Sequence, residues 1–178
     1  PGNTVRVSSA DIPRNSVVAI CLGWIGDNFP EAQMVIRDRK SGIVNGEHPA
    51  RALVEKPNPF YDCASLWAAT AMDYAVTGNA YWLKLRPKGS GRLAPTELWW
   101  MPSGLVEPIA GSRGEFLVGY SYRCGGEDVR LAASDVVHFR FSLDGNDPRK
   151  GAHRVDAVGR EIATDDDASS YMQSVLKN

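Results

Sequence analysis

The chain has 178 residues, of which 43% are apolar and 23% are charged, which is the composition of an ordinary globular domain rather than of a disordered chain. Its longest apolar run, residues 17–25, is far shorter than the ~20 residues that cross a bilayer, so no membrane association is expected. A formal net charge of −1 argues against a domain that holds nucleic acid mainly through its phosphates.

The first helix is predicted to start at Ser9 or Asp11, either of which can act as its N-cap, and to end near Asn28. Its apolar residues fall on two sides, so we expect the helix to be buried on both. Residues 33–38 then alternate loosely, as in a strand. The two apolar sides of the helix are formed by Val17, Ile20, Cys21 and Trp24, and by Val18, Leu22 and Ile25.

Two more helices are predicted before the first long strand. The first, over residues 48–56, ends at Pro57-Asn58-Pro59 because two prolines around an asparagine cannot continue a helix. Asp62 is the predicted N-cap of the second, which is nearly all apolar and extends through Val76. Gly78 is expected to end it, since glycine readily takes the left-handed conformation of a helix stop. This helix should lie at the centre of the core.

From Asn79 onward the apolar period changes to two, which is typical of strands. Lys88 to Arg92 should form the tip of a hairpin between the first two strands. The short strands and glycine-rich turns predict a meandering, mostly antiparallel sheet. The strands are expected over residues 80–86, 96–101, 105–109, 117–123, 128–131 and 136–141.

A long C-terminal helix is predicted over residues 152–176, with an apolar stripe that is interrupted in its middle. The fold class is therefore α+β, with buried N-terminal helices packed on the sheet and this helix last. The chain divides into an α+β domain over residues 1–151 and a helical segment over residues 152–178.

Residues with catalytic or metal-binding chemistry are few and scattered. The three cysteines lack CxxC spacing, and we expect Cys21 and Cys63 to pack as small hydrophobic residues in a reduced cytosol. His48, His138 and His153 have no carboxylate or second histidine at metal-ligand spacing, so structural roles are expected. Residues 144–147 resemble a calcium loop but lack its closing glutamate, and they are interpreted as a polar turn. The sequence predicts no catalytic residue, no cofactor and no metal, and hence no enzyme.

The clearest charged cluster lies in the predicted last helix and comprises Glu161, Asp165, Asp166 and Asp167. Such a cluster is usually a solvated face, and its other interpretation is a contact with a basic surface of a partner. A metal-dependent nuclease that uses Glu161, Asp165 and Asp166 is an alternative, although carboxylates that converge on them from strands are not evident.

A basic surface is available in the same chain, on the predicted hairpin and near the first turn. It could meet the acidic helix of another copy in a head-to-tail ring contact, or it could bind nucleic acid as a small binding module. The sequence does not separate these two possibilities. The hairpin residues are Lys84, Arg86, Lys88 and Arg92, and those near the first turn are Arg37, Arg39 and Lys40.

Five groups of short strings, in order between Ser16 and Gly151, together resemble the portal proteins of tailed double-stranded-DNA bacteriophages and prophages. Each string alone is common, but their shared order carries the resemblance. The strings are Ser16–Ile25 followed by Pro30; His48-Pro49 through Leu53-Val54 to Lys56-Pro57-Asn58; Gly78-Asn79-Ala80-Tyr81-Trp82; Glu97-Leu98-Trp99-Trp100-Met101-Pro102 with Val106-Glu107-Pro108; and Asp135-Val136-Val137-His138-Phe139 with Asp144-Gly145 and Lys150-Gly151.

The resemblance implies a structural subunit of a homo-oligomeric ring, a dodecamer, at the portal vertex of the virion capsid, assembled in the bacterial cytoplasm. Double-stranded DNA would pass through the ring without sequence-specific binding during packaging and ejection. Terminase, scaffold or capsid proteins, and head–tail connector proteins would dock on it. The resemblance implies no active site.

The resemblance assigns residues 1–151 to the wing region of such a subunit and residues 152–178 to a helix that leads toward a stem and clip. Members of the family often have Ser-Pro-Leu after the last matching glycine, whereas this chain has Ala152-His153-Arg154-Val155. The chain therefore departs from the family pattern at the start of the last helix. Family chains also continue through the stem and clip, and those regions have no counterpart in the sequence.

Overall fold

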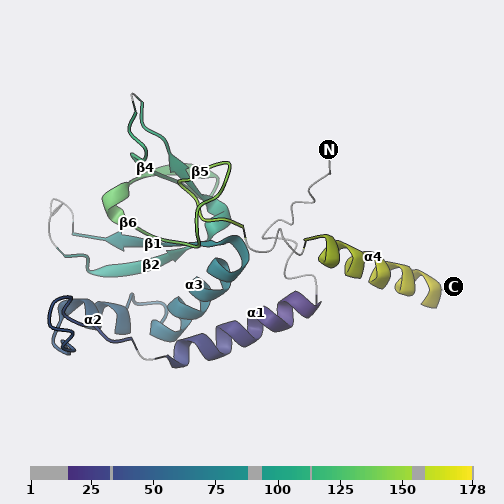
Figure 1. The fold of residues 1–178 in the computed structure, drawn as a ribbon, viewed down its shortest axis with the longest axis horizontal. Helices are drawn as coiled ribbons and strands as arrows, with labels where there is room; N and C mark the ends of the chain where they lie inside the picture. The colour runs from purple at the N-terminus through teal and green to yellow at the C-terminus, as the bar shows by residue number, and fades with distance from the viewer. Residues whose placement is uncertain (1–15, 33, 88–93, 113, 154–158, 178) are drawn as a thin grey trace.

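The computed structural model describes residues 16–32, 34–87, 94–112, 114–153 and 159–177. Two helices lie against one face of a three-stranded sheet, a third helix packs on the outer side of this layer, and a second three-stranded sheet lies on the other face (Figure 1). The last helix lies apart from these layers (Figure 1). Helices packed with antiparallel sheets of short strands confirm the predicted α+β class.

Helix α3 (Cys63–Thr77) is the central helix of the helical layer, and both of its ends follow the predicted local signals. The Asp62 carboxylate accepts a hydrogen bond of 2.9 Å from the backbone N–H of Ser65, which satisfies one free donor at the helix start. Gly78 takes a left-handed φ of 70° at the other end. Leu66 and Thr70 on this helix are buried. The smaller helix α2 (Pro49–Glu55) begins after His48, whose ring nitrogen accepts the backbone N–H of Ala50.

Helix α1 (Ser16–Asn28) is buried on one side only, so the predicted burial of both sides is wrong. Val18 and Leu22 pack toward Val76 of α3, whereas Ile20 is 72% exposed and Trp24 is 67% exposed. The expectation for Cys21 is also wrong, because its thiol lies on the exposed side. The main contacts of α1 with other described elements are with α3 and the 3₁₀ helix η2 (Phe29–Glu31), and the side chains on its other side are exposed. An apolar pattern in the sequence shows which side chains of a helix can be buried. It does not show whether this chain or another one covers them.

The strand expected over residues 33–38 is absent from the described part of that stretch, where a single bridge joins Arg37 to Val44. The Asp38 carboxylate accepts hydrogen bonds from the backbone N–H of Lys40 and from both the N–H and the hydroxyl of Ser41. These bonds fold the chain into a local turn, because a short aspartate side chain competes with strand pairing for backbone donors.

The six strands predicted after Asn79 are confirmed, but they form two sheets rather than one meander. Strand β1 (Asn79–Leu85) lies between β2 (Glu97–Met101) and β6 (Val136–Arg140), and both pairings are antiparallel. The second sheet is a true meander of β3 (Val106–Ile109), β4 (Gly119–Cys124) and β5 (Glu127–Ala132). The first four residues of β1 are buried, so the backbone groups on both of its edges need hydrogen-bond partners, which β2 and β6 supply.

The alternation of β1 creates two cores. Trp82 points toward the helices, where it packs with Leu66 of α3 and Leu98 of β2. Its neighbour Tyr81 points to the opposite face and packs with Met101 and Tyr120 between the two sheets. One strand therefore anchors the helical layer on one side and the second sheet on the other.

The last helix, α4, spans Gly159–Leu176. Ala152 and His153, which were expected to open it, are not helical, and residues 154–158 lie outside the described part of the chain. The described side chains of α4 are exposed. Within the described residues, no helix combines the length and apolar character that a membrane crossing requires.

Candidate functional site

The strongest convergence of polar groups surrounds the side chain of Asn79, which is only 5% exposed. Its amide nitrogen donates to the carbonyl oxygens of Thr77 (2.8 Å) and Gly151 (3.1 Å). Its amide oxygen accepts the backbone N–H of Gly151 at 2.7 Å and lies 3.0 Å from Nε2 of His138. We call these four residues the Asn79 junction. It joins the end of α3, the strand β6 and the chain that leaves the domain.

Gly151 in the junction and Gly78 next to it must both be glycine, because the backbone approaches each of them too closely for a side chain. Any Cβ at Gly151 would overlap the carbonyl oxygen of Gly78, and any Cβ at Gly78 would overlap the carbonyl oxygen of Ala152. The backbone carbonyl of Gly78 instead accepts the N–H of Phe141 at 2.8 Å, and the N–H of Ala152 donates to the Phe141 carbonyl at 2.9 Å. Ala152 therefore pairs with the backbone just after β6, and Gly151 is held next to it by the Asn79 side chain.

His138 fills the inner side of the junction as a neutral ring. Its ring stacks on Tyr81 with centroids 4.1 Å apart, and Nδ1 lies 3.2 Å from the hydroxyl of Tyr120. Burial lowers the pKa of His138 to about 3, with a smaller contribution from the positive charge of Arg140. Because the Asn79 oxygen can only accept, Nε2 carries the proton and Nδ1 accepts from Tyr120. A histidine held neutral with both nitrogens engaged is a structural group, and it points away from Val137 and Phe139 as predicted.

The Pro57-Asn58 string closes the outer edge of β2. The backbone N–H of Leu98 donates to the Pro57 carbonyl at 2.7 Å, and the side-chain amide of Asn58 donates to the Leu98 carbonyl at 2.8 Å. Two residues further along β2, the Tyr61 hydroxyl accepts the backbone N–H of Trp100 at 2.6 Å. This edge is therefore covered by the chain itself, which prevents pairing with another strand there.

A second, partly buried polar contact ties α3 to the 3₁₀ helix η3 (Ser103–Leu105). The Asp73 carboxylate accepts the Ser103 backbone N–H at 2.8 Å and also its hydroxyl. Burial raises the pKa of Asp73 even though these hydrogen bonds act in the opposite direction. The contact was not predicted, since Asp73 and Ser103 stand in unrelated parts of the sequence and neither belongs to a motif.

The structure gives the charged residues of the predicted interface different environments. Arg86 forms an ion pair with Asp135 of its own chain and is 18% exposed, so its charge is largely used within the domain. Lys84 is half-buried on β1, whereas Lys88 and Arg92 lie outside the described residues. The basic hairpin is thus only partly available to a partner.

The acidic cluster lies on α4. Asp165 and Asp167 are exposed there, and the side chains of Glu161 and Asp166 lie outside the described part of the structure. Among the described residues, no three histidine, cysteine or acidic side chains are grouped as metal ligands. At residues 144–147, the Asp144 carboxylate accepts the N–H groups of Asn146 and Asp147, which is the predicted polar turn.

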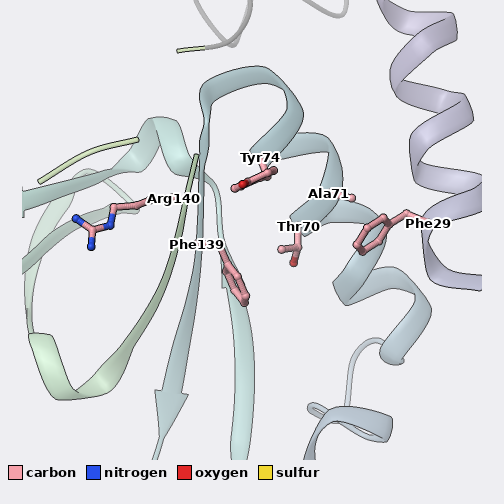
Figure 2. Close-up of a pocket in the computed structure, with 6 residues that line it drawn as sticks. All are labelled: Phe29, Thr70, Ala71, Tyr74, Phe139 and Arg140. Atoms are coloured by element: carbon pink, nitrogen blue, oxygen red, sulfur yellow. The ribbon is translucent and has the colours of Figure 1, made fainter. Parts of the chain in front are cut away.

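A small pocket of about 200 Å³ opens between α3 and β6. The Thr70 hydroxyl in its lining already accepts the Trp82 indole N–H at 2.7 Å and donates to the Leu66 carbonyl at 2.6 Å. Figure 2 shows the Arg140 guanidinium directed away from the Phe139 ring. The lining of the pocket is mainly apolar. It is lined by Phe29, Thr70, Ala71, Tyr74, Phe139 and Arg140.

Residues 16–178 match the family described as phage portal protein, and the described part of this match contains the Asn79 junction and the closed β2 edge. The chain belongs to the phage portal protein family. In this portal-family chain, the strings that carried the resemblance build the junction, the helix stop and the strand edge.

Individual relatives agree with the family at low sequence identity. An uncharacterized protein of Rickettsia bellii (strain RML369-C) is 22% identical over 180 residues, which cover 98% of this chain and 45% of that protein. This portal-family chain therefore spans less than half the length of that curated relative.

Solved structures share the fold. A chain from the neck of an empty gene transfer agent particle, computed with C6 symmetry, has a TM-score of 0.82 at 22% identity, covering 100% of this chain and 47% of that one. The neck of the native particle, computed with C12 symmetry, contains a chain with a TM-score of 0.76 at 22% identity, covering 100% and 46%. An HK97 family phage portal protein from Corynebacterium diphtheriae has a TM-score of 0.52 at 16% identity, covering 79% and 42%.

Proposed function

We propose that this chain is the wing region of a ring-forming portal subunit in a phage or phage-like particle, and that its role is structural. The observation that carries the proposal is the family match over residues 16–178. The chemistry of the site supports it, because the polar groups of the Asn79 junction hydrogen-bond within the chain and none is presented to a substrate.

The whole subunit would form a homo-oligomeric ring at the portal vertex of the virion, after assembly in the bacterial cytoplasm. The C12 symmetry used for the neck of the native gene transfer agent particle is consistent with a dodecamer. The ring would conduct double-stranded DNA during packaging and ejection, without reading its sequence. It would also be the platform for terminase, scaffold or capsid proteins, and head–tail connector proteins.

The division into a wing over residues 1–151 and a helix toward the stem over residues 152–178 is part of the same proposal. The paired segment Gly151–Ala152 supports it, because its backbone hydrogen bonds fix where the chain leaves the layered domain. Helix α4 then extends away from the layers (Figure 1), as a connection to a further region would.

The test is negative-stain electron microscopy of the purified protein, expressed with any residues that flank this chain in its gene. Rings with a central channel are expected at micromolar concentration. Particles that remain monomeric at all concentrations would contradict the proposal. Saturable binding of Mg²⁺ or Mn²⁺ in calorimetry would instead support the nuclease alternative, and strongly salt-dependent DNA binding by monomers would support a nucleic-acid-binding module.

A further inference from the structure

Helix α1 presents a continuous apolar stripe to solvent, which we call the α1 face. Its members follow the spacing i, i+3, i+4, i+7, so they lie in one row along the helix. Their side chains are well exposed, with Val17 at 58%, Ile20 at 72% and Trp24 at 67%. The α1 face consists of Val17, Ile20, Cys21 and Trp24, and the Cys21 thiol is exposed in its middle.

The α1 face is a firm surface, because the other side of the same helix is packed. Val18 and Leu22 contact Val76 of α3. Gly26 is buried so closely that an added Cβ would lie 3.1 Å from the sulfur of Met72. An anchored helix that exposes an ordered apolar row is typical of a protein interaction site.

Helix α4 carries a second exposed apolar row over its last two turns, which we call the α4 face. Its residues are again three and four apart, so they share one side of the helix. They are exposed to a similar degree, with Met172 at 63% and Val175 at 56%. The α4 face consists of Tyr171, Met172, Val175 and Leu176.

Both faces lie in stretches of helix that carry no charge. Residues 16–26 of α1 contain no charged side chain, and neither do residues 168–176 of α4. Pairing them would remove apolar area from water without burying an unpaired charge, as the centre of a stable interface requires. The acidic residues Asp165 and Asp167 would then lie at the rim, where they stay hydrated.

We propose that the α1 face of one copy binds the α4 face of a second copy of this chain. The inference rests on the proposed ring, since a closed ring needs two unlike surfaces on each subunit that meet head to tail. A contact of one α1 face with another would be symmetric and would stop at a dimer. Each copy carries one α1 face and one α4 face, so the contact propagates from copy to copy until the ring closes.

The native Cys21 makes the contact directly testable by crosslinking. In the purified protein with Cys63→Ser and Cys124→Ser, Val175→Cys adds one thiol to the α4 face, and a short bis-maleimide is then added. The expected product on a denaturing gel is a ladder of covalent dimers, trimers and larger species. The matched control carries Cys21→Ser in addition, so that only the thiol of Val175→Cys remains. With one thiol in each chain it is expected to give dimers at most.

Other products would overturn the proposal in distinguishable ways. A crosslinked monomer of altered mobility would mean that α4 binds the α1 face of its own chain. Dimers that form without Val175→Cys would mean a symmetric contact between two α1 faces. Rings seen by microscopy that give no ladder would refute this interface and leave the proposed portal function standing. The absence of both rings and ladder would count against both proposals.

Discussion

The side-chain amide of Asn79 hydrogen-bonds both backbone groups of Gly151, a residue 72 positions later in the chain. One side chain thus makes the two hydrogen bonds that a neighbouring strand would otherwise make with Gly151. It holds the segment that leaves the layered domain against the start of β1. Because all of its polar atoms are used inside the protein, the convergence of the motif residues serves the fold.

Asn79→Ala is expected to lower the free energy of unfolding by about 3 kcal/mol, because it leaves the Gly151 backbone and His138 without buried partners. Urea unfolding followed by circular dichroism measures the loss. Asn146→Ala is the matched control, since that side chain is exposed, and it is expected to change stability by less than about 0.5 kcal/mol. Equal effects of the two substitutions would contradict the role of the junction.

Gly151→Ala is expected to destabilise the protein by about 2–4 kcal/mol, because its Cβ would overlap the carbonyl oxygen of Gly78. Gly145→Ala provides the comparison, since no atom lies within 4 Å of an added Cβ at that position. The control should be neutral or slightly stabilising through a less flexible unfolded chain. The difference between the two melting temperatures tests the close packing directly.

The stability of the protein should fall as the pH is lowered below about 6.5, and His138 is the expected cause. Its pKa is about 3 in the folded state and 6.5 as an ordinary value, so between these values the unfolded state binds the extra proton. The contribution is fully present above pH 6.5 and is lost as the pH falls toward 3.

His138→Gln removes this titration and should flatten the pH dependence. Urea midpoints of the wild type and the variant are compared at pH 7 and pH 5, and the wild type should lose more stability between them. A parallel decline in both proteins would show that other groups govern the acid sensitivity.

Local signals in the sequence predicted the helices and strands well where a single residue determines a boundary. Asp62 and Gly78 defined α3 at both ends because capping and a left-handed stop act within one turn. The return of β6 to β1 could not be predicted in this way. β1 lies in the middle of its sheet with Tyr81 and Trp82 buried on opposite faces. This position follows from how the layers assemble and not from a local signal.

The candidate site was predictable as a set of residues but not as an arrangement. Gly78, Asn79, His138 and Gly151 all belong to the strings that carried the family resemblance, yet their spacing gives no sign that they meet. The exposure of the α1 face was missed for a related reason. A sequence pattern gives the apolar area of a helix, and the covering surface is a property of the fold or of another chain.

The acidic cluster is expected to contribute to assembly more than to folding if a basic surface of another copy faces it. Asp166→Lys together with Asp167→Lys should weaken ring formation, most strongly at low salt, and leave the urea midpoint nearly unchanged. Glu115→Lys with Glu127→Lys reverses two exposed charges outside α4 and is the matched control. Unchanged assembly of the α4 variant would assign the cluster to a solvated face.

Ile20→Lys places a charge in the middle of the α1 face without disturbing the core, because Ile20 is 72% exposed. If the face is buried between copies, the lysine must be desolvated there, and the dissociation constant should rise at least about tenfold. Ile43→Lys is a close control, since that isoleucine is 68% exposed and lies in the turn after Asp38, away from α1. Both variants should keep the wild-type unfolding midpoint. Analytical ultracentrifugation across a concentration series then separates them, and assembly that is equally strong in both would exclude the α1 face from the interface.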